Sequence, residues 1–300
     1  MGSLLLYFAD EQAPALRLAE ALGLPAAAIE RHRFPDDELR LRLPFGAGQA
    51  IPRQVLLYRS LDRPNDKLVE LLLVAGEARA LGVQRLLLVA PYLAYMRQDI
   101  AFNPGEVVSQ TIVGAFIAQH FEGLVTVDPH LHRIERLQQA VPLGEAAIAL
   151  SGAPMLARLI AEQRQQPLLL GPDAESAQWI EAAAAAFNFD QGVCHKQRSG
   201  DRQVSIELPA LDFRGRQVVL LDDVASSGRT LAGAASQLLA AGAASVDVAV
   251  THALFAGDAL AVIKAAGVGE VWSTDCIAHP SNAIAMAPLL AAALQPLLSA

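Results

Sequence analysis

The stretch VVLLDDVASSGRTL, residues 218–231, decides the fold of this chain. It begins with four apolar residues, the pattern of a parallel strand that is buried on both faces. Two acids, Asp222 and Asp223, come next, and a short hydroxyl-rich turn then leads into an apolar helix pattern over residues 231–239. The sequence therefore predicts a strand, a tight turn and a helix, with two carboxylates at the carboxyl end of the strand.

Such a turn suits a phosphorylated sugar. Backbone N–H groups and hydroxyls at a helix N-terminus attract a phosphate, and the two carboxylates can accept hydrogen bonds from two sugar hydroxyls. The residues expected to bind the phosphate are Ser226, Ser227, Gly228, Arg229 and Thr230. Arg229 adds a cation that either pairs with phosphate or crowds the turn. The alternative is an ordinary strand–turn–helix with an acidic turn.

The composition describes a folded chain of 300 residues, long enough for two domains with cores. Hydrophobic residues make up 53% and charged residues 18%, which argues against disorder. The net charge of −8 argues against nucleic-acid binding. Cys194 and Cys276 provide neither a disulfide framework nor zinc spacing. Apolar runs are too short for a signal core or a membrane span, so we expect a cytoplasmic protein.

Strands and helices alternate along the whole chain, which predicts an α/β fold with mostly parallel sheets and helices on both faces. The two halves of the chain look related, because RQVLL at residues 53–57 resembles RQVVL at residues 216–220. Chance similarity between short α/β segments is the alternative to duplication. The expected strands are 3–9, 38–43, 54–58, 84–90, 123–127, 167–170, 204–208, 217–221, 246–251 and 270–273. The expected helices are 11–22, 65–81, 106–120, 155–163, 177–187, 231–241 and 282–298.

Polar side chains also follow other expected strands, where ligands bind in open α/β sheets. Arg97 and Gln98 supply donors for a phosphate and a planar base. The imidazole of His130 and the carboxylate of Asp128 can hold a divalent cation or a phosphate, and Asp173 adds a third carboxylate after a strand. The alternatives are a solvated loop for Arg97 and Gln98, a structural role for His130 and a turn-forming role for Asp173.

A basic segment, CHKQRSG, covers residues 194–200. Lys196 and Arg198 project alike if the segment is extended. Two cations on a mobile loop suit a phosphoryl group in transfer, because they neutralise its developing charge. A solvated basic loop is the alternative.

Together these segments follow the order and spacing of one family. Over nearly its whole length the sequence resembles the ribose-phosphate pyrophosphokinases, which make phosphoribosyl diphosphate (PRPP). Residues 218–231 resemble the PRPP loop of type I phosphoribosyltransferases, with Ser227 in place of the usual threonine and Arg229 in place of a glycine. The other matching motifs are FPDDE at 34–38, PYLAYMRQD at 91–99, DPH at 128–130, PD at 172–173, KQR at 196–198 and SNAI at 281–284.

The resemblance implies two related type I phosphoribosyltransferase domains, an ATP-side domain at 1–144 and a ribose 5-phosphate-side domain at 145–281. A helix at 282–300 is expected to pack back on the first. The implied reaction transfers the β,γ-diphosphoryl group of Mg-ATP to the 1-hydroxyl of ribose 5-phosphate and gives PRPP and AMP.

The resemblance also implies residue roles. Lys196 and Arg198 would be catalytic. The implied ATP contacts are Phe34, Asp36, Glu38, Arg97, Gln98, Asp99 and His130. The implied ribose 5-phosphate contacts are Asp173, Asp222, Asp223, Ser226, Ser227, Gly228, Arg229 and Thr230. Magnesium is the implied cofactor, with His130 and Asp173 as its ligands.

Three stretches depart from the family pattern: Ile100-Ala101-Phe102, Glu175-Ser176 and Leu131-His132-Arg133. They predict weak control by phosphate and ADP and a divergent branch, closer to the shorter archaeal-like enzymes. The resemblance implies a homodimer or higher homo-oligomer in which the 34–38 hairpin completes the adenine site of a neighbouring subunit. The rival functions are a phosphoribosyltransferase that consumes PRPP and a non-catalytic partner of a synthetase.

Overall fold

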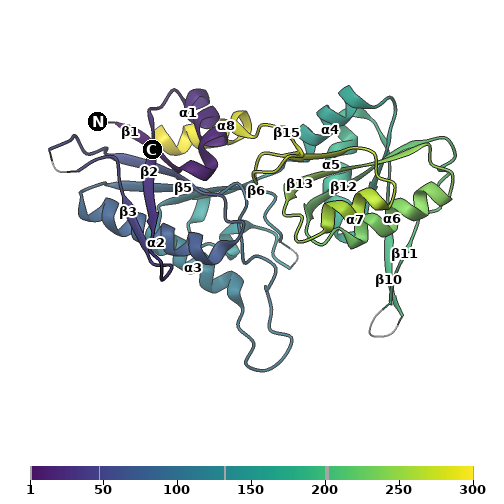
Figure 1. Ribbon diagram of the computed structural model, residues 1–300, viewed down its shortest axis with the longest axis horizontal. Coiled ribbons are helices and arrows are strands. Elements are labelled where there is room, and N and C mark those ends of the chain that lie inside the picture. The colour runs from purple at the N-terminus through teal and green to yellow at the C-terminus, as the bar shows by residue number, and fades with distance from the viewer. Residues whose placement is uncertain (1, 47, 132, 200–202, 300) are drawn as a thin grey trace. The chain divides into compact units, whose positions relative to one another are not determined.

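The computed structural model describes residues 2–46, 48–131, 133–199 and 203–299 (Figure 1). The chain divides into two compact units, which we call unit 1 (Met1–Leu150 with Ala285–Ala300) and unit 2 (Ser151–Ile284). Each unit contains a mostly parallel sheet with helices on both faces, which confirms the expected fold class. None of the described helices is long and apolar enough to cross a bilayer.

Unit 1 is built on a seven-stranded sheet in the order β3-β2-β1-β4-β5-β6-β7. All neighbouring strands are parallel except β2 and β3, which form a hairpin. The strands are β1 (Ser3–Phe8), β2 (Ala26–Arg33), β3 (Leu39–Arg42), β4 (Gln54–Tyr58), β5 (Arg85–Val89), β6 (Gly123–Val127) and β7 (Ala147–Leu150). The helices are α1 (Gln12–Leu22), α2 (Pro64–Ala80), α3 (Ser109–His120) and α8 (Ala287–Ser299).

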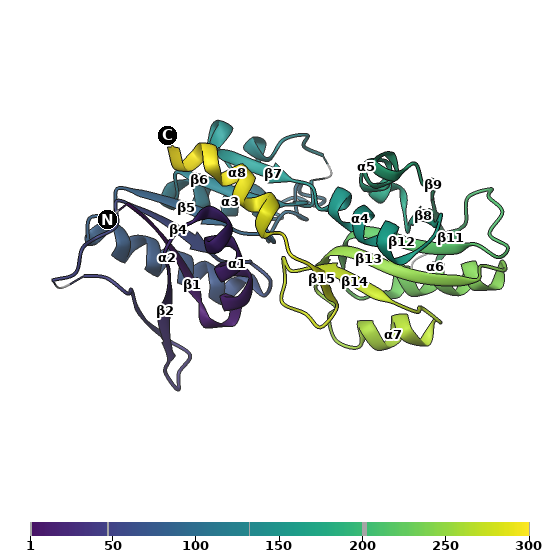
Figure 2. The same ribbon diagram turned by 90° about the horizontal axis from the view of Figure 1, so that it is seen from above.

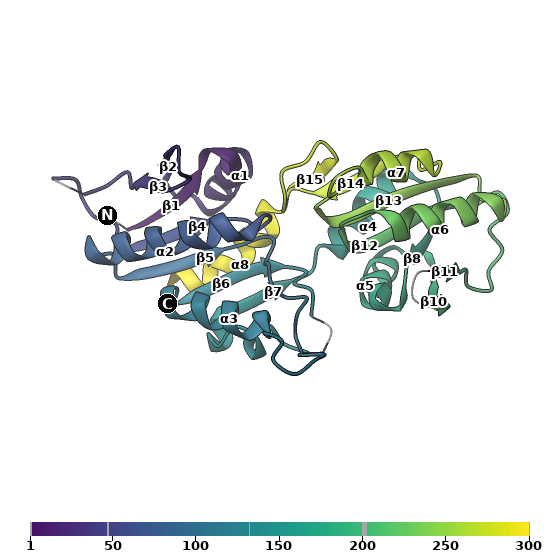
Figure 3. The same cartoon turned by 60° about the horizontal axis from the view of Figure 1, so that its bottom comes forward.

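The core of unit 1 forms because its central strands are apolar on both faces. Strands β4 and β6 are buried at every position. Helices α2 and α3 cover one face, where Leu71 and Ile117 join Leu6 and Phe8 in a single cluster. Helices α1 and α8 cover the other face (Figure 1). Although α8 comes from the far end of the chain, it packs against α1 and alongside β6 (Figure 3).

Unit 2 is built on a six-stranded sheet in the order β15-β14-β13-β12-β8-β9, in which every pair is parallel. A separate antiparallel hairpin, β10–β11, extends from this unit. The strands are β8 (Leu168–Gly171), β9 (Asp190–Val193), β10 (His195–Ser199), β11 (Gln203–Glu207), β12 (Gln217–Ala225), β13 (Ser245–Ala253), β14 (Val271–Thr274) and β15 (Asn282–Ile284). The helices are α4 (Ala153–Gln163), α5 (Ala177–Phe187), α6 (Arg229–Ala240) and α7 (Ala259–Ala265).

The alternation of side chains along β12 makes the core of unit 2 two-sided. Val218 and Leu220 pack in a cluster with residues of α6 and α7. Val219 and Leu221 pack in a second cluster with residues of α4 and α5. The two helix pairs therefore lie on opposite faces of the sheet (Figure 2).

Several elements differ from the sequence prediction. Strands β2, β7 and β9 and helix α7 were not expected, and all three strands lie at or next to a sheet edge. Strand β2 opens with three alanines and β9 reads DQGV, so neither has the composition of a strand. Pairing with a neighbouring strand, a tertiary effect, sets their conformation.

The end of the chain also differs from the prediction, because residues 282–284 form β15 and the helix begins only at Ala287. The side-chain amide of Asn282 explains the difference. Its Nδ2 donates to the carbonyl oxygens of Thr274 and Ile277, at 2.6 and 3.0 Å, and to Ser273 Oγ at 2.9 Å. These bonds hold the segment extended beside β14.

Candidate functional site

The acid pair lies on a strand that is longer than predicted. Strand β12 continues to Ala225 instead of ending at Leu221, because β13 runs beside it and pairs His252 with Val224. The carboxyl end of β12 therefore holds both acids within the sheet. This rigid setting orients Asp222 and Asp223 better than a free turn would.

The predicted phosphate turn follows directly. Two backbone bonds brace it, from Phe255 N–H to the Ala225 carbonyl at 2.8 Å and from Ala256 N–H to the Ser226 carbonyl at 3.0 Å. Gly228 caps α6 with a φ of 69°, a left-handed conformation that suits glycine. The first turn of a helix leaves N–H groups without intrahelical partners, so the N-terminus of α6 can receive an anion.

The side chains of this turn remain accessible. Ser227 and Arg229 are exposed, and Ser226 and Thr230 are half-buried. Hydroxyls, a guanidinium and helix N–H groups thus lie together on one short segment. Groups of this kind can bind a phosphate monoester through charge-assisted hydrogen bonds.

Three carboxylates lie near one another at the carboxyl edge of the unit 2 sheet. Asp223 is 3% exposed, and its N–H donates to Asp222 Oδ1 at 3.0 Å. Asp173 follows β8 and caps a short 3-10 helix, Ala174–Ser176, where its Oδ1 accepts from Glu175 N–H at 3.1 Å. Burial raises the pKa of Asp222, and the nearby Asp223 and Asp173 carboxylates raise it further. The edge therefore favours a hydroxyl donor or a cation.

The donor set fits magnesium. Carboxylate oxygens are the ligands that Mg²⁺ prefers, and it commonly takes only one or two of them together with substrate phosphates. Across the described part of the chain, no three His, Cys, Asp or Glu side chains are arranged to hold a metal ion by themselves. A magnesium ion bound here would therefore take ligands from its substrates as well.

The basic segment is a strand and not the loop that was expected. Strand β10 pairs with β11, so that Lys196 faces Ile206 and Arg198 faces Val204 in the ladder. Because they are two residues apart on a strand, Lys196 and Arg198 belong to the same face. Their side chains lie outside the part of the chain that the structure describes.

In unit 1, residues 34–38 form the tip of the β2–β3 hairpin. Phe34 N–H donates to the Glu38 carbonyl at 2.9 Å, and Asp37, with a φ of 71°, donates back to the Phe34 carbonyl at 3.0 Å. Phe34 is 39% exposed, and its ring meets the His32 ring edge-on. Phe34, Asp36 and Glu38 are thus all displayed at an exposed tip.

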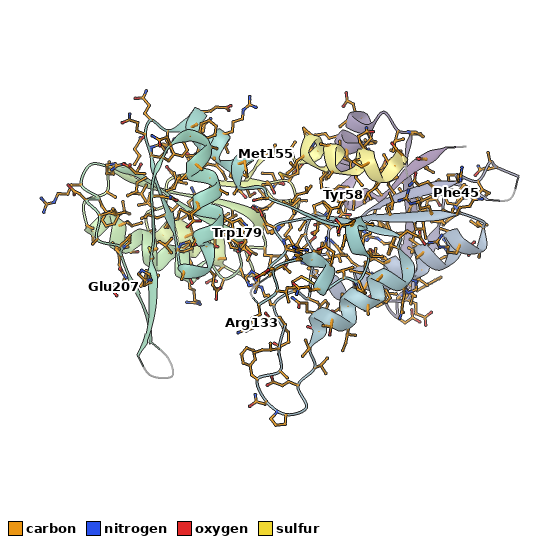
Figure 4. The ribbon with its side chains drawn as sticks, turned by 180° about the vertical axis from the view of Figure 1, so that it is seen from behind. Phe45, Tyr58, Arg133, Met155, Trp179 and Glu207 are labelled. Carbon is orange, nitrogen blue, oxygen red and sulfur yellow. The ribbon has the colours of Figure 1, made fainter. Side chains whose placement is uncertain are left out.

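The loop after β5 presents Arg97 to solvent but withdraws Asp99. The Asp99 side chain is 1% exposed, and its Oδ1 accepts from Arg133 Nη1 at 2.6 Å. Arg133, labelled in Figure 4, belongs to the loop after β6, which also carries the half-buried His130. The ion pair therefore joins the two loops in which ATP contacts were expected.

Two of the departures from the family pattern meet at this ion pair. The Arg133 guanidinium lies over the Phe102 ring, 5.6 Å from its centroid. Asp99 Oδ2 is buried without a hydrogen-bond partner among the described residues. His132, which belongs to the same departure as Arg133, is outside those residues.

A buried ion-pair network in unit 1 escaped the sequence prediction. Arg59, 1% exposed, follows β4, and Asp10 and Glu11 follow β1. Arg59 Nη1 lies 2.9 Å from Asp10 Oδ2 and 3.1 Å from Glu11 Oε2, and its Nε donates to Glu70 Oε2 at 2.7 Å. For Asp10, Glu11 and Arg59, the signal available in the sequence was their position directly after a strand.

The chain was compared with known proteins. Residues 5–120 match the family model of the N-terminal domain of ribose phosphate pyrophosphokinase, and residues 145–264 match that of the phosphoribosyl transferase domain. The ribose-phosphate pyrophosphokinase of Methanopyrus kandleri is 32% identical over 285 residues, which cover 94% of each chain. That of Saccharolobus solfataricus is 33% identical over 265 residues, 87% of this chain and 88% of the relative.

A solved structure shows the same fold. The phosphoribosylpyrophosphate synthetase from Mycobacterium smegmatis is 21% identical and superposes with a TM-score of 0.82. The superposition covers 100% of this chain and 99% of the other. With the acid pair and phosphate turn in place on β12 and α6, these matches show that the chain belongs to the ribose-phosphate pyrophosphokinase family.

Proposed function

We propose that the chain is a ribose-phosphate diphosphokinase. It transfers the β,γ-diphosphoryl group of Mg-ATP to the 1-hydroxyl of ribose 5-phosphate and releases PRPP and AMP. The observation that carries the proposal is the acid pair of β12 followed by a braced phosphate turn at the start of α6. Relatives that share most of the chain's length and bear this enzyme name support it.

Unit 2 is the ribose 5-phosphate side in this proposal. Asp222 and Asp223 accept hydrogen bonds from ribose hydroxyls. The β12–β13 ladder fixes their backbone and so holds both carboxylates in position. The segment from Ser226 to Thr230 binds the 5-phosphate through hydroxyls and N–H groups. Anchoring both ends of the sugar places its 1-hydroxyl for attack, a positioning effect.

Unit 1 is the ATP side. Phe34 supplies an exposed ring for the adenine, and Asp36 and Glu38 supply acceptors for its amino group. Arg97 and Gln98 supply donors to the nucleotide. Asp99 acts through Arg133, since its own carboxylate is buried.

Magnesium completes the proposed site, with Asp173 and His130 as its protein ligands. When bound, the ion would supply positive charge that offsets the negative charge of the phosphate groups. Lys196 and Arg198, on one face of β10, neutralise the charge that develops on the diphosphoryl group as it passes to the sugar.

The test is product stoichiometry. Purified protein with Mg-ATP and ribose 5-phosphate should form AMP and PRPP in equal amounts, and omission of the sugar should abolish AMP formation. ADP as the nucleotide product, or AMP release without the sugar, would sink the proposal. The rival phosphoribosyltransferase is tested in the same preparation by pyrophosphate release from PRPP with added nucleobases.

We also propose that the protein works as at least a homodimer. The support is the exposed 34–38 tip, whose aromatic and acidic side chains are available to a neighbouring subunit. Light scattering on the active enzyme should give at least twice the mass of one chain. A fully active monomer would refute it.

A further inference from the structure

The β2–β3 hairpin that displays Phe34 reaches beyond the sheet. Strand β2 pairs with β1 only over residues 26–29, and its far half, residues 30–33, pairs with β3. Figure 2 shows this arm projecting from the unit. A two-stranded ribbon is marginally stable alone, so contacts outside the ladder must set the position of its tip.

Two arginines tether the arm to helix α2. Arg31 Nη1 donates to Glu70 Oε1 at 2.6 Å, and Arg33 Nη2 donates to Asp66 Oδ2 at 2.7 Å. The two arginines are two residues apart on a strand, so they lie on one face of that strand. The two acids are four residues apart on α2, so they lie on one face of that helix. The Arg31–Glu70 and Arg33–Asp66 ion pairs thus connect the arm to the helix at two neighbouring points, and we call them the Arg31 rung and the Arg33 rung.

The two rungs differ in burial. The Arg33 and Asp66 side chains are 40% and 64% exposed, so water screens their attraction. Glu70 is fully buried and Arg31 is 31% exposed. Charge-assisted hydrogen bonds are stronger where the surroundings exclude water. The Arg31 rung is therefore the one that restrains the arm.

Glu70 is itself fixed from behind by Arg59. The Arg59 Nε and Nη2 lie 2.7 and 2.5 Å from Glu70 Oε2. Its guanidinium lies 4.5 Å from the centroid of the Phe8 ring. Arg31 also meets Asp10, at 3.1 Å, and Asp10 is a second partner of Arg59. The rung therefore ends on an ion-pair network at the carboxyl ends of β1 and β4, in which Arg59 and Glu70 are buried and Asp10 is partly exposed.

We infer that Arg31 is a positioning residue: through Glu70 and Arg59 it holds the hairpin tip in the conformation that receives ATP. The inference rests on the proposed function, in which Phe34, Asp36 and Glu38 contact the nucleotide. Without the rung the tip samples other positions, and apparent affinity falls with the fraction that remains competent. A loss of about tenfold is expected for one charge-assisted bond at a partly exposed site.

The experiment compares Arg31→Gln with Arg33→Gln, a matched change on the exposed rung. In Arg31→Gln the KM for ATP should rise about tenfold, while kcat and the KM for ribose 5-phosphate stay within about twofold, because the arm belongs to the ATP side. Arg33→Gln should change the KM for ATP much less. Arg31→Lys, which keeps the charge, should recover part of the loss.

Hydrogen exchange supplies a readout that needs no substrate. The amides of residues 30–38 should exchange faster in Arg31→Gln than in the wild type or in Arg33→Gln. Equal exchange in all three proteins, or a KM for ATP in Arg31→Gln that matches Arg33→Gln, overturns the inference. A wild-type protein that makes no AMP instead overturns the proposed function and leaves hydrogen exchange to test the tether.

Discussion

Gly228→Ala should destabilise unit 2 strongly, because two separate penalties meet at this residue. Its φ of 69° lies in the left-handed region, which costs a residue with a Cβ about 1–2 kcal/mol. An added Cβ would also lie 2.8 Å from Ile263 Cδ1 and 3.0 Å from the Ala259 carbonyl oxygen. The backbone carbonyl belongs to α7 and cannot move without shifting that helix.

Gly257→Ala is the matched control. Gly257 has nearly the same φ, 62°, but a Cβ there would have no atom within 4 Å. Its substitution therefore carries the conformational penalty alone. Alanine recovers part of that penalty by restricting the unfolded chain, which leaves about 1 kcal/mol. Crowding at Gly228 adds about 1–3 kcal/mol, so Gly228→Ala should cost about 2–4 kcal/mol.

Urea denaturation followed by tryptophan fluorescence measures this difference in the right place. Both tryptophans of the chain, Trp179 and Trp272, are buried in the core of unit 2, and Trp179 is labelled in Figure 4. With a slope of about 2 kcal/mol/M, the midpoint should fall by about 1–2 M for Gly228→Ala and by about 0.5 M for Gly257→Ala.

The comparison between the two variants decides the outcome. Equal midpoints for the two variants would refute the close approach of α7 to the phosphate turn. A Gly257→Ala protein less stable than Gly228→Ala would refute it as well. A change in slope without a change in midpoint would mean that the substitution alters the compactness of the unfolded chain instead.

Four further predictions follow from the site and its surroundings. Lys196→Ala should lower kcat on the order of 10³-fold, while calorimetry shows near-normal substrate binding. Asp223→Ala should in addition raise the KM for ribose 5-phosphate. Near-normal turnover in Lys196→Ala would contradict the catalytic role of Lys196. Burial raises the pKa of Glu11 from 4.5 to about 7. Between pH 4.5 and about pH 7, Glu11 therefore keeps a proton in the folded state that it has lost in the unfolded chain, so the free energy of unfolding falls as the pH rises. Glu11→Gln should reduce this change of unfolding free energy with pH, measured by calorimetry. An unchanged pH dependence would contradict the raised pKa of Glu11. A double-mutant cycle of Asp99→Asn with Arg133→Ala should give a coupling free energy of about 1–3 kcal/mol in unfolding, and additive effects would mean that the ion pair does not join the two loops. Steady-state rates at saturating magnesium should change little with phosphate concentration, and steep sigmoidal activation would contradict weak phosphate control.

The sequence alone determined the α/β class and the centre of the site. Apolar runs such as residues 55–58 and 86–89 form stable strands only when both faces of the strand are buried, so these strands were predictable. The acid pair and the turn after it are contiguous in the chain. Their chemistry could therefore be read locally, before any long-range contact was known.

Tertiary structure alone decided the edges of the sheets and the contacts between distant segments. The extension of β12 past Leu221 depends on the length of β13, and the alanines of β2 are extended because β1 lies beside them. The tether from Arg31 to Glu70 and the network behind it join residues on separate elements. Such pairings depend on where the fold places each charge, and no local pattern in the sequence encodes that placement.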